Sequence, residues 1–136
     1  LFVMLRPGTA DGERDDPTVR RCRGYAGSWG YGWLEVVNLF AWRATDPGEL
    51  TKVGPDVDVI GPENDAHIAA AARRADRIVC GWGVGRERWY RGRQVAALLR
   101  GIRPDLYALS VNARGEPSHP LYLRADLTPV RWEPPA

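Results

Sequence analysis

Four short apolar runs, separated by segments with helical spacing, are the feature that most constrains the fold of this chain. The runs occupy residues 1–5, 34–40, 77–83 and 106–111 and are rich in the β-branched, aliphatic and aromatic residues of buried strands. Residues 15–30, 61–75 and 88–102 lie between them and repeat apolar side chains at helical intervals. Strands that alternate with helices favour a parallel α/β sheet with right-handed crossovers.

The helix starts carry recognisable signals. Asp16 is expected to cap the first helix, with Pro17 at its first position, and Gly30 or Gly32 is expected to end it. Pro62 marks the start of the second helix. His67 falls early in that helix, where we expect a solvated surface residue.

Length and composition limit the classes of protein to consider. At 136 residues with a net charge of +2, the chain fits a single α/β domain over residues 1–136 and has no bulk charge that selects a partner. No run is apolar enough for a membrane span, so we expect no membrane association. Cys22 and Cys80 lack metal-ligand spacing and are expected to be reduced core residues of a cytoplasmic protein, with no metal or cofactor. Because residue 1 already lies in an apolar run, we expect a segment upstream of it.

Polar residues and turn formers follow the predicted strands. In an open parallel sheet, ligands bind at the carboxyl ends of the strands, where the strand order reverses. A Pro-Gly turn after the first run can present backbone N–H groups, and the long segment 41–61 follows the second run. The candidate ligand-binding residues are Arg6, Gly8, Thr9, Asn38, Phe40, Arg43 and Thr45, and the candidate catalytic residues are Asp11, Asp15 and His119.

Asn38 is the sharpest of these candidates. Its amide lies between Val37 and Leu39, and a buried amide left without partners costs ~1–3 kcal/mol. Its donor and acceptor can read the edge of a nucleobase. The alternative is that Asn38 caps the backbone of a neighbouring loop. His119 and Asp15 also have alternative, structural interpretations. His119 can be an incidental loop residue, and Asp15 can help to cap the first helix.

Several longer motifs resemble those of a bacterial and phage family catalogued as domain of unknown function 1643. The matching stretches are "LRPGTAD", "DDPTVRRC", "VVNLFAWRATDP", "GPENDAHI" and "HPLYL", which together cover nearly all of the chain. Membership in that family supplies no activity.

A second resemblance, over short stretches only, is to the uracil-DNA glycosylase superfamily and especially its mismatch-specific branch. "RPGTA", "VNLFAWRAT" and "SHPLY" stand in the places of that branch's motifs. The resemblance implies a three-layer α/β sandwich with a four-stranded parallel sheet in the order 2-1-3-4. It also implies that Asn38 binds the base edge, that Arg43 lies near a backbone phosphate, and that His119 lies by the base or the leaving group.

Arg6 departs from both patterns, because it stands where the family turn has asparagine. A guanidinium stays protonated and is a poor general base. Either Asp11 or Asp15 takes that role, or the protein binds without cleaving. We therefore expect a nucleobase- or nucleotide-binding domain with a nucleobase, nucleotide or DNA as partner, and with N-glycosidase activity on a modified base as its candidate reaction. The alternative is a noncatalytic interaction or accessory module of phage or mobile-element origin.

Overall fold

The computed structural model describes residues 1–7, 16–41, 60–83 and 86–135, with the backbone only for residues 86–89. Within these ranges, five strands form one mixed sheet in the order β2-β1-β3-β4-β5. Strands β1 to β4 run parallel to one another, and β5 pairs antiparallel with β4. The strands are β1 (Phe2–Met4), β2 (Val36–Asn38), β3 (Val79–Cys80), β4 (Leu106–Ala108) and β5 (Val130–Trp132).

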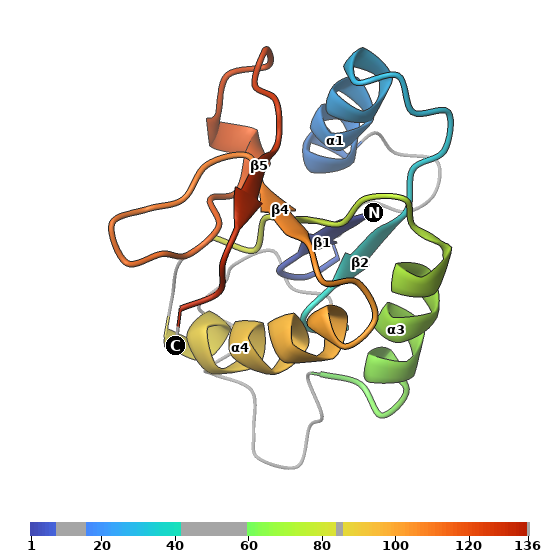
Figure 1. Cartoon of the computed structure of the whole chain (residues 1–136), viewed down its shortest axis with the longest axis vertical. Helices are drawn as coiled ribbons and strands as arrows, with labels where there is room; N and C mark the ends of the chain where they lie inside the picture. Colours follow the sequence, from blue (N-terminus) through green and yellow to red (C-terminus); the bar gives the residue numbers. More distant parts are fainter. Residues whose placement is uncertain (8–15, 42–59, 84–85, 136) are drawn as a thin grey trace.

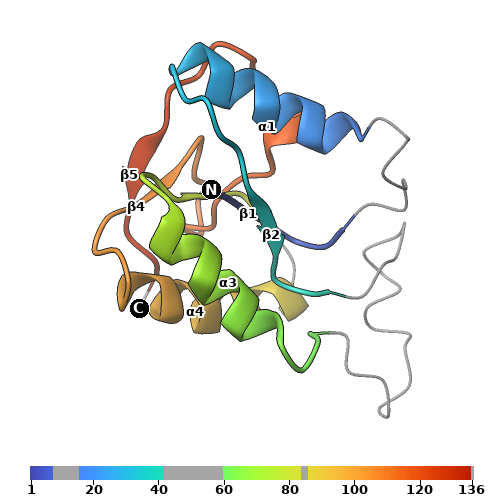
Figure 2. The ribbon, with the colours of Figure 1, turned by 90° about the vertical axis from the view of Figure 1, so that its right-hand side faces the viewer.

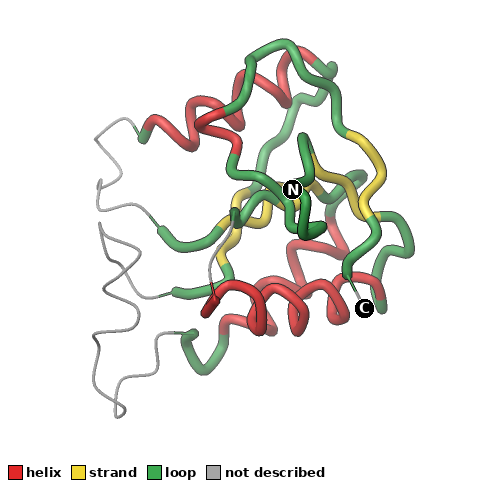
Figure 3. The backbone as a smooth tube through the Cα atoms, turned by 90° about the vertical axis from the view of Figure 1, so that its left-hand side faces the viewer, coloured by secondary structure: helices red, strands yellow, loops and turns green. Residues whose placement is uncertain are grey.

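Helices cover both faces of this sheet and produce three layers. Helix α1 lies on one face, whereas α3 and α4 lie on the other (Figures 1 and 2). The backbone seen from the opposite side shows the same arrangement, with the strands between the helices (Figure 3). The helices are α1 (Pro17–Ser28), α3 (Asn64–Arg74), α4 (Arg86–Arg100) and the short 3₁₀ helix η1 (Pro120–Tyr122). The predicted α/β class is confirmed.

The start and end of α1 follow the sequence signals. Asp16 Oδ1 accepts hydrogen bonds from the N–H groups of Thr18 and Val19 at 2.8 and 3.3 Å, and Pro17 occupies the first helical position. Gly30 follows the helix with φ of 86°, a conformation that favours glycine. Helix α3 begins at Asn64, two residues after the predicted start at Pro62. His67 is exposed, as predicted.

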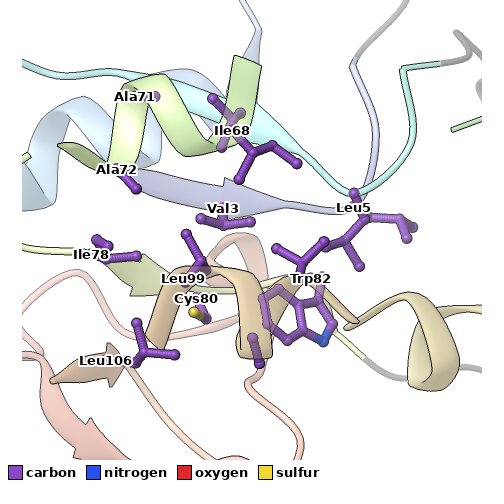
Figure 4. Packing of buried hydrophobic residues seen from close by; sticks show 14 of the residues in the cluster. Val3, Leu5, Ile68, Ala71, Ala72, Ile78, Cys80, Trp82, Leu99 and Leu106 are labelled. Atoms are coloured by element: carbon purple, nitrogen blue, oxygen red, sulfur yellow. The ribbon is translucent and has the colours of Figure 1, made fainter. Parts of the chain in front are cut away.

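Alternate strand residues face the two helical layers. Val3 and Cys80 belong to the core cluster that contains Ile68 of α3 and Leu99 of α4 (Figure 4). Phe2 and Met4 face α1, where they join a smaller cluster with Cys22 and Tyr25. This alternation follows from the two-residue period of a strand. Both predicted reduced cysteines are free and buried.

The predicted order of the parallel strands, 2-1-3-4, is confirmed, but the predicted count of four strands is wrong. The four apolar runs of the sequence do not include Val130–Trp132, yet this segment of the proline-rich tail adds a fifth strand beside β4. The reason is that Trp132 buries its ring against the fully buried Trp82, with ring centroids 5.4 Å apart. The prolines flank this short strand and do not interrupt its hydrogen bonds with β4.

None of the helices in the described ranges has the length and apolar character of a transmembrane segment.

Candidate functional site at the carboxyl edge of the sheet

The strand order reverses between β1 and β3, because the chain passes from β1 outward to β2 and later from β3 outward to β4. Parallel α/β sheets bind ligands at the carboxyl ends of the strands beside such a reversal. Here that edge holds Met4 of β1, its register partner Asn38 of β2, and Gly81, which follows β3. The chain following β1 and β2 stays together beyond the strands, since the Phe40 N–H donates to the Leu5 carbonyl at 3.0 Å.

Two side chains from the helices hold the main chain at the end of β2. Asn64 Nδ2, at the start of α3, donates to the Asn38 carbonyl at 2.9 Å and to the Leu39 carbonyl at 3.1 Å. Arg91 Nε, on α4, donates to the same Leu39 carbonyl at 2.8 Å. Asn64 and Arg91 are both buried, so these bonds are shielded from water. The end of β2 is therefore fixed by α3 and α4 together.

Arg91 also pairs with Asp65. The Arg91 guanidinium is 4 % exposed, and its second nitrogen lies 2.6 Å from Asp65 Oδ1, whose side chain is 63 % exposed. A buried guanidinium needs a compensating charge, and this carboxylate supplies it from the rim of the protein. Asn64 and Asp65 are consecutive residues of "GPEND", so one short motif holds both β2 and Arg91.

The hydrogen bonds from Asn64 and Arg91 involve the main chain at the end of β2 and not the side chain of Asn38. Its residue is half-buried, and no hydrogen bond of its amide is found in the described part of the chain. The sequence left open whether Asn38 caps a neighbouring backbone. Within the described residues the amide that bonds main-chain carbonyls here is that of Asn64, not that of Asn38. Among the described residues, neither the donor nor the acceptor of the Asn38 amide has a hydrogen-bond partner.

A second segment reaches the same edge from beyond β4. The Asn112 side chain accepts from the N–H groups of Arg114 and Glu116, both at 2.9 Å, and reverses the chain. The returning strand-like segment bonds back at Ser118, whose N–H donates to the Ser110 carbonyl at 2.9 Å, and the Pro117 carbonyl accepts from Gly83 at 2.9 Å. This turn delivers His119 and Pro120 to the end of β3.

Pro120 sits directly on Gly81. A Cβ at position 81 would lie 3.1 Å from Pro120 Cδ, so only glycine allows this approach without a shift. His119 caps η1, because its Nδ1 accepts the Leu121 N–H at 3.2 Å. In the neutral imidazole this places the proton on Nε2. The His119 ring also lies 5.8 Å from the ring of Tyr122, centroid to centroid.

The remaining predicted site residues divide into two groups. Arg6 is half-buried just after β1, at the same edge, and Phe40 is buried in the larger core cluster, so its ring serves packing. The other six lie outside the described residues: Gly8, Thr9, Asp11, Asp15, Arg43 and Thr45. In the described ranges, no group of three His, Cys, Asp or Glu side chains is arranged to hold a metal ion.

Two hollows lie beside α1. The larger, of about 480 Å³, is lined by residues of α1 together with Leu121 of η1 and Ala125. The other, of about 160 Å³, opens at the amino ends of the strands, where Glu35 accepts two hydrogen bonds from Arg74 at 2.7 and 2.8 Å. The hydrogen bonds from Arg74 lower the pKa of Glu35 to about 2. The amino end is the edge of a parallel sheet that does not carry the site, so we assign this ion pair to structure.

Sequence reasoning missed the buried polar residues that build the edge. Asn64 and Arg91 were seen only as parts of helical segments, and Glu116, also buried, accepts a bond of 3.4 Å from Trp82 Nε1. The one available signal was "GPEND", where an asparagine follows a proline at a helix start and precedes an apolar face.

No curated protein and no solved structure matches the chain significantly. The family model described as "Protein of unknown function (DUF1643)" matches residues 1–121, which is most of the chain. The match includes strands β1 to β4, helices α1, α3 and α4, and the residues His119 and Pro120. The chain therefore belongs to the DUF1643 family.

Proposed function

We propose that this protein binds a nucleobase, free or within a nucleotide or DNA, at the carboxyl edge of its sheet. The observation that carries the proposal is Asn38. Its main chain is fixed by Asn64, whereas its half-buried amide has no hydrogen bond within the described ranges. An amide held in this way can donate and accept at the same time, as the edge of a base requires.

The position of the His119 loop is a second observation that supports the proposal. Pro120 contacts Gly81 at the end of β3, and Met4, the register partner of Asn38, also lies next to Gly81. Segments that are far apart in the sequence therefore meet along one edge. A base contacted by Asn38 would therefore lie at the same edge of the sheet as the His119 loop.

The reaction that we propose for this site is hydrolysis of an N-glycosidic bond, in the manner of the mismatch-specific branch of the uracil-DNA glycosylases. The strand order 2-1-3-4 agrees with that branch. His119 would lie by the base or the leaving group, and Asp11 or Asp15 would activate the water. Binding without cleavage is the second candidate. Arg6 favours it, because the guanidinium stands where that branch has its water-activating amide and cannot accept a proton.

Calorimetry with a panel of nucleosides, nucleotides and base-containing DNA tests the binding proposal. We expect the wild type to bind at least one member, and Asn38→Ala to abolish that binding with little change in melting temperature, because the amide has no bond to lose among the described residues. Asn38→Asp is the matched control, since it keeps the size and an acceptor but loses the donor. If the wild type binds no member of the panel, the proposal is wrong.

Base release separates the two candidates. Arg6→Asn restores the asparagine of the family turn, and free base is measured after incubation with each bound ligand. Release by the wild type or by Arg6→Asn supports the glycosidase. Binding with no release by either protein supports the noncatalytic module.

A further inference from the structure

The hollow of about 160 Å³ at the amino ends of the strands has no part in the proposed function, and its walls are rich in aromatic side chains. We call it the amino-edge hollow. It lies between α1 and α3, beside the N-terminus (Figures 1 and 2). A cavity of about 150 Å³ holds one benzene ring, so the hollow has room for about one aromatic side chain. Three aromatic residues line it, namely Trp29, Tyr31 and Trp33.

The wall that Trp29 forms is fixed by neighbouring side chains. The Trp29 ring stacks on Phe2 and on Tyr25, with ring centroids 6.0 and 5.4 Å apart. Its Nε1 donates a hydrogen bond to the Leu127 carbonyl at 3.0 Å. A hollow that is formed in advance loses little conformational entropy when a ring enters it.

Trp33 belongs to the same lining but projects into water. Its residue is 80 % exposed, and no ring of the described residues stacks on it. Exposed apolar surface beside a hollow marks a site of interaction, and tryptophan is among the residues that most often carry the binding energy of protein interfaces. One patch of the surface therefore presents both a projecting ring and a hollow that admits one ring.

The charged side chains that line the hollow are balanced. They are two carboxylates and two guanidinium groups, those of Glu35, Asp76, Arg74 and Arg77. Glu35 and Arg74 already pair with each other. A ligand that carries one sign of charge would meet a like charge at this patch, so the balance favours a partner that carries both signs.

Asp76 and Arg77 are the two charges left for such a partner. Neither takes part in an ion pair within the ranges that the structure describes, although Asp76 attracts the Leu1 ammonium from a greater distance. The Arg77 guanidinium carbon lies 4.4 Å from the centroid of the Tyr107 ring. Because Asp76 and Arg77 are consecutive, a twofold axis beside them would set Asp76 of one protomer against the partner's Arg77, and the reverse pair would form at the same time.

We propose that the amino-edge hollow is a self-association surface, where two copies of this chain pair about a twofold axis and each packs Trp33 into the hollow of the other. An interface of this kind uses the same patch on both copies, so the projecting ring, the hollow and both charges must all lie on one patch, as they do here. A small aromatic molecule would fill the hollow but would leave Trp33, Asp76 and Arg77 in water. The proposal is independent of the proposed function, because the carboxyl edge lies at the other end of the strands.

Sedimentation equilibrium over about a hundredfold range of protein concentration tests the proposal. We expect a dimer whose fraction rises with concentration. Trp33→Ala should raise the dimer Kd at least about 30-fold, the fold-change that defines a hot-spot residue. Tyr122→Ala is the matched control, because Tyr122 is 84 % exposed but does not line the hollow, and it should leave the Kd unchanged.

Charge reversal tests the twofold arrangement itself. Asp76→Arg should raise the dimer Kd about tenfold or more, because it sets like charges against each other at both ends of the interface. Arg77→Asp should act in the same way with negative charges. A mixture of the two single variants should form a dimer with one copy of each, since every altered side chain then faces an opposite charge. Native mass spectrometry identifies this heterodimer by its mass, and the melting temperature of each variant shows that it is folded.

Three results would overturn the proposal: a wild type that stays monomeric at every concentration, a dimer whose Kd is unchanged in both Trp33→Ala and Asp76→Arg, or a mixture of the charge variants that forms no heterodimer although both are folded. If Arg77→Asp does not fold, Trp33→Ala and Asp76→Arg still decide. Indole, added to a monomeric wild type and followed by calorimetry, identifies the other occupant. Indole binding that is lost in Trp33→Ala would assign the hollow to a small aromatic ligand, against the proposal.

Discussion

Replacing Asn64 by alanine tests whether the end of β2 is held as the geometry indicates. The change removes the donor to the Asn38 carbonyl at 2.9 Å and to the Leu39 carbonyl at 3.1 Å. The Leu39 carbonyl keeps Arg91 Nε at 2.8 Å, so the net loss is one satisfied acceptor, at Asn38. An unsatisfied buried carbonyl costs about 1–3 kcal/mol and a part-buried one such as that of Asn38 costs less than the upper value, whereas the better helix propensity of alanine returns about 0.5 kcal/mol. We expect a loss of about 1–2 kcal/mol in the free energy of unfolding.

Urea denaturation followed by circular dichroism measures this loss, and the melting temperature should fall by about 4–8 °C. His67→Ala, an exposed position of the same helix, is the control and should leave stability unchanged. Any ligand of the carboxyl edge should also bind Asn64→Ala more weakly than the remaining folded fraction predicts, because Asn38 is no longer held. A loss below about 0.5 kcal/mol, the ordinary scatter of surface substitutions, would refute the role that we give to Asn64.

Two further predictions concern the His119 loop and the amino edge of the sheet. Gly81→Ala brings a Cβ to 3.1 Å from Pro120 Cδ and should destabilise the protein by about 1–3 kcal/mol, measured by thermal denaturation. Gly27→Ala is the control and should not destabilise it, because a Cβ at position 27 meets nothing within 4 Å. Equal effects of the two substitutions would contradict the close contact between Gly81 and Pro120. The pKa of Glu35 is about 2, below the usual 4.5, so its pair with Arg74 contributes stability above pH 4.5 that is lost as the pH falls toward 2. Glu35→Gln should therefore be less stable than the wild type at pH 7, and most of this difference should be gone at pH 2, where about half of the Glu35 carboxyl groups are protonated. An undiminished difference at pH 2 in denaturant titrations would contradict this account.

The sequence determined the sheet up to its last strand. The runs around Val3, Val37, Val79 and Leu106 are apolar on both faces, which is what a sheet covered by helices requires, and all four became parallel strands. Strand β5 was not predicted because Val130–Trp132 is only three residues long and lies between prolines. Neither its hydrophobic periodicity nor its length marks it as a strand. The strand forms because Trp132 contacts Trp82, which lies 50 residues earlier in the sequence. A local sequence pattern does not reveal such a contact.

The sequence predicted at which edge of the sheet Asn38 lies, but not which residues hold its main chain there. The position of Asn38 in the second half of the apolar run 34–40 was sufficient to place it near the carboxyl end of a strand. The identity of its supporting residues depends on how α3 and α4 pack, because Asn64 and Arg91 reach Leu39 from different helices. Helix packing is a tertiary property, and a single sequence offers no period or motif from which that meeting could be derived.

The position of β2 in the sheet explains why this support comes from side chains. Within the part of the chain that the structure describes, β2 is an edge strand that pairs with β1 alone, so it has half of the main-chain partners that a central strand has. At its carboxyl end, where pairing with β1 runs out, two buried side chains from the helices bond the Asn38 and Leu39 carbonyls. Their rigidity is what a recognition residue on an edge strand needs, since an amide displaced by 1 Å no longer matches a base edge. The buried pair of Asn64 and Arg91 thus fixes the main chain at the end of β2, and the proposed function assigns contact with the ligand to Asn38 and the His119 loop.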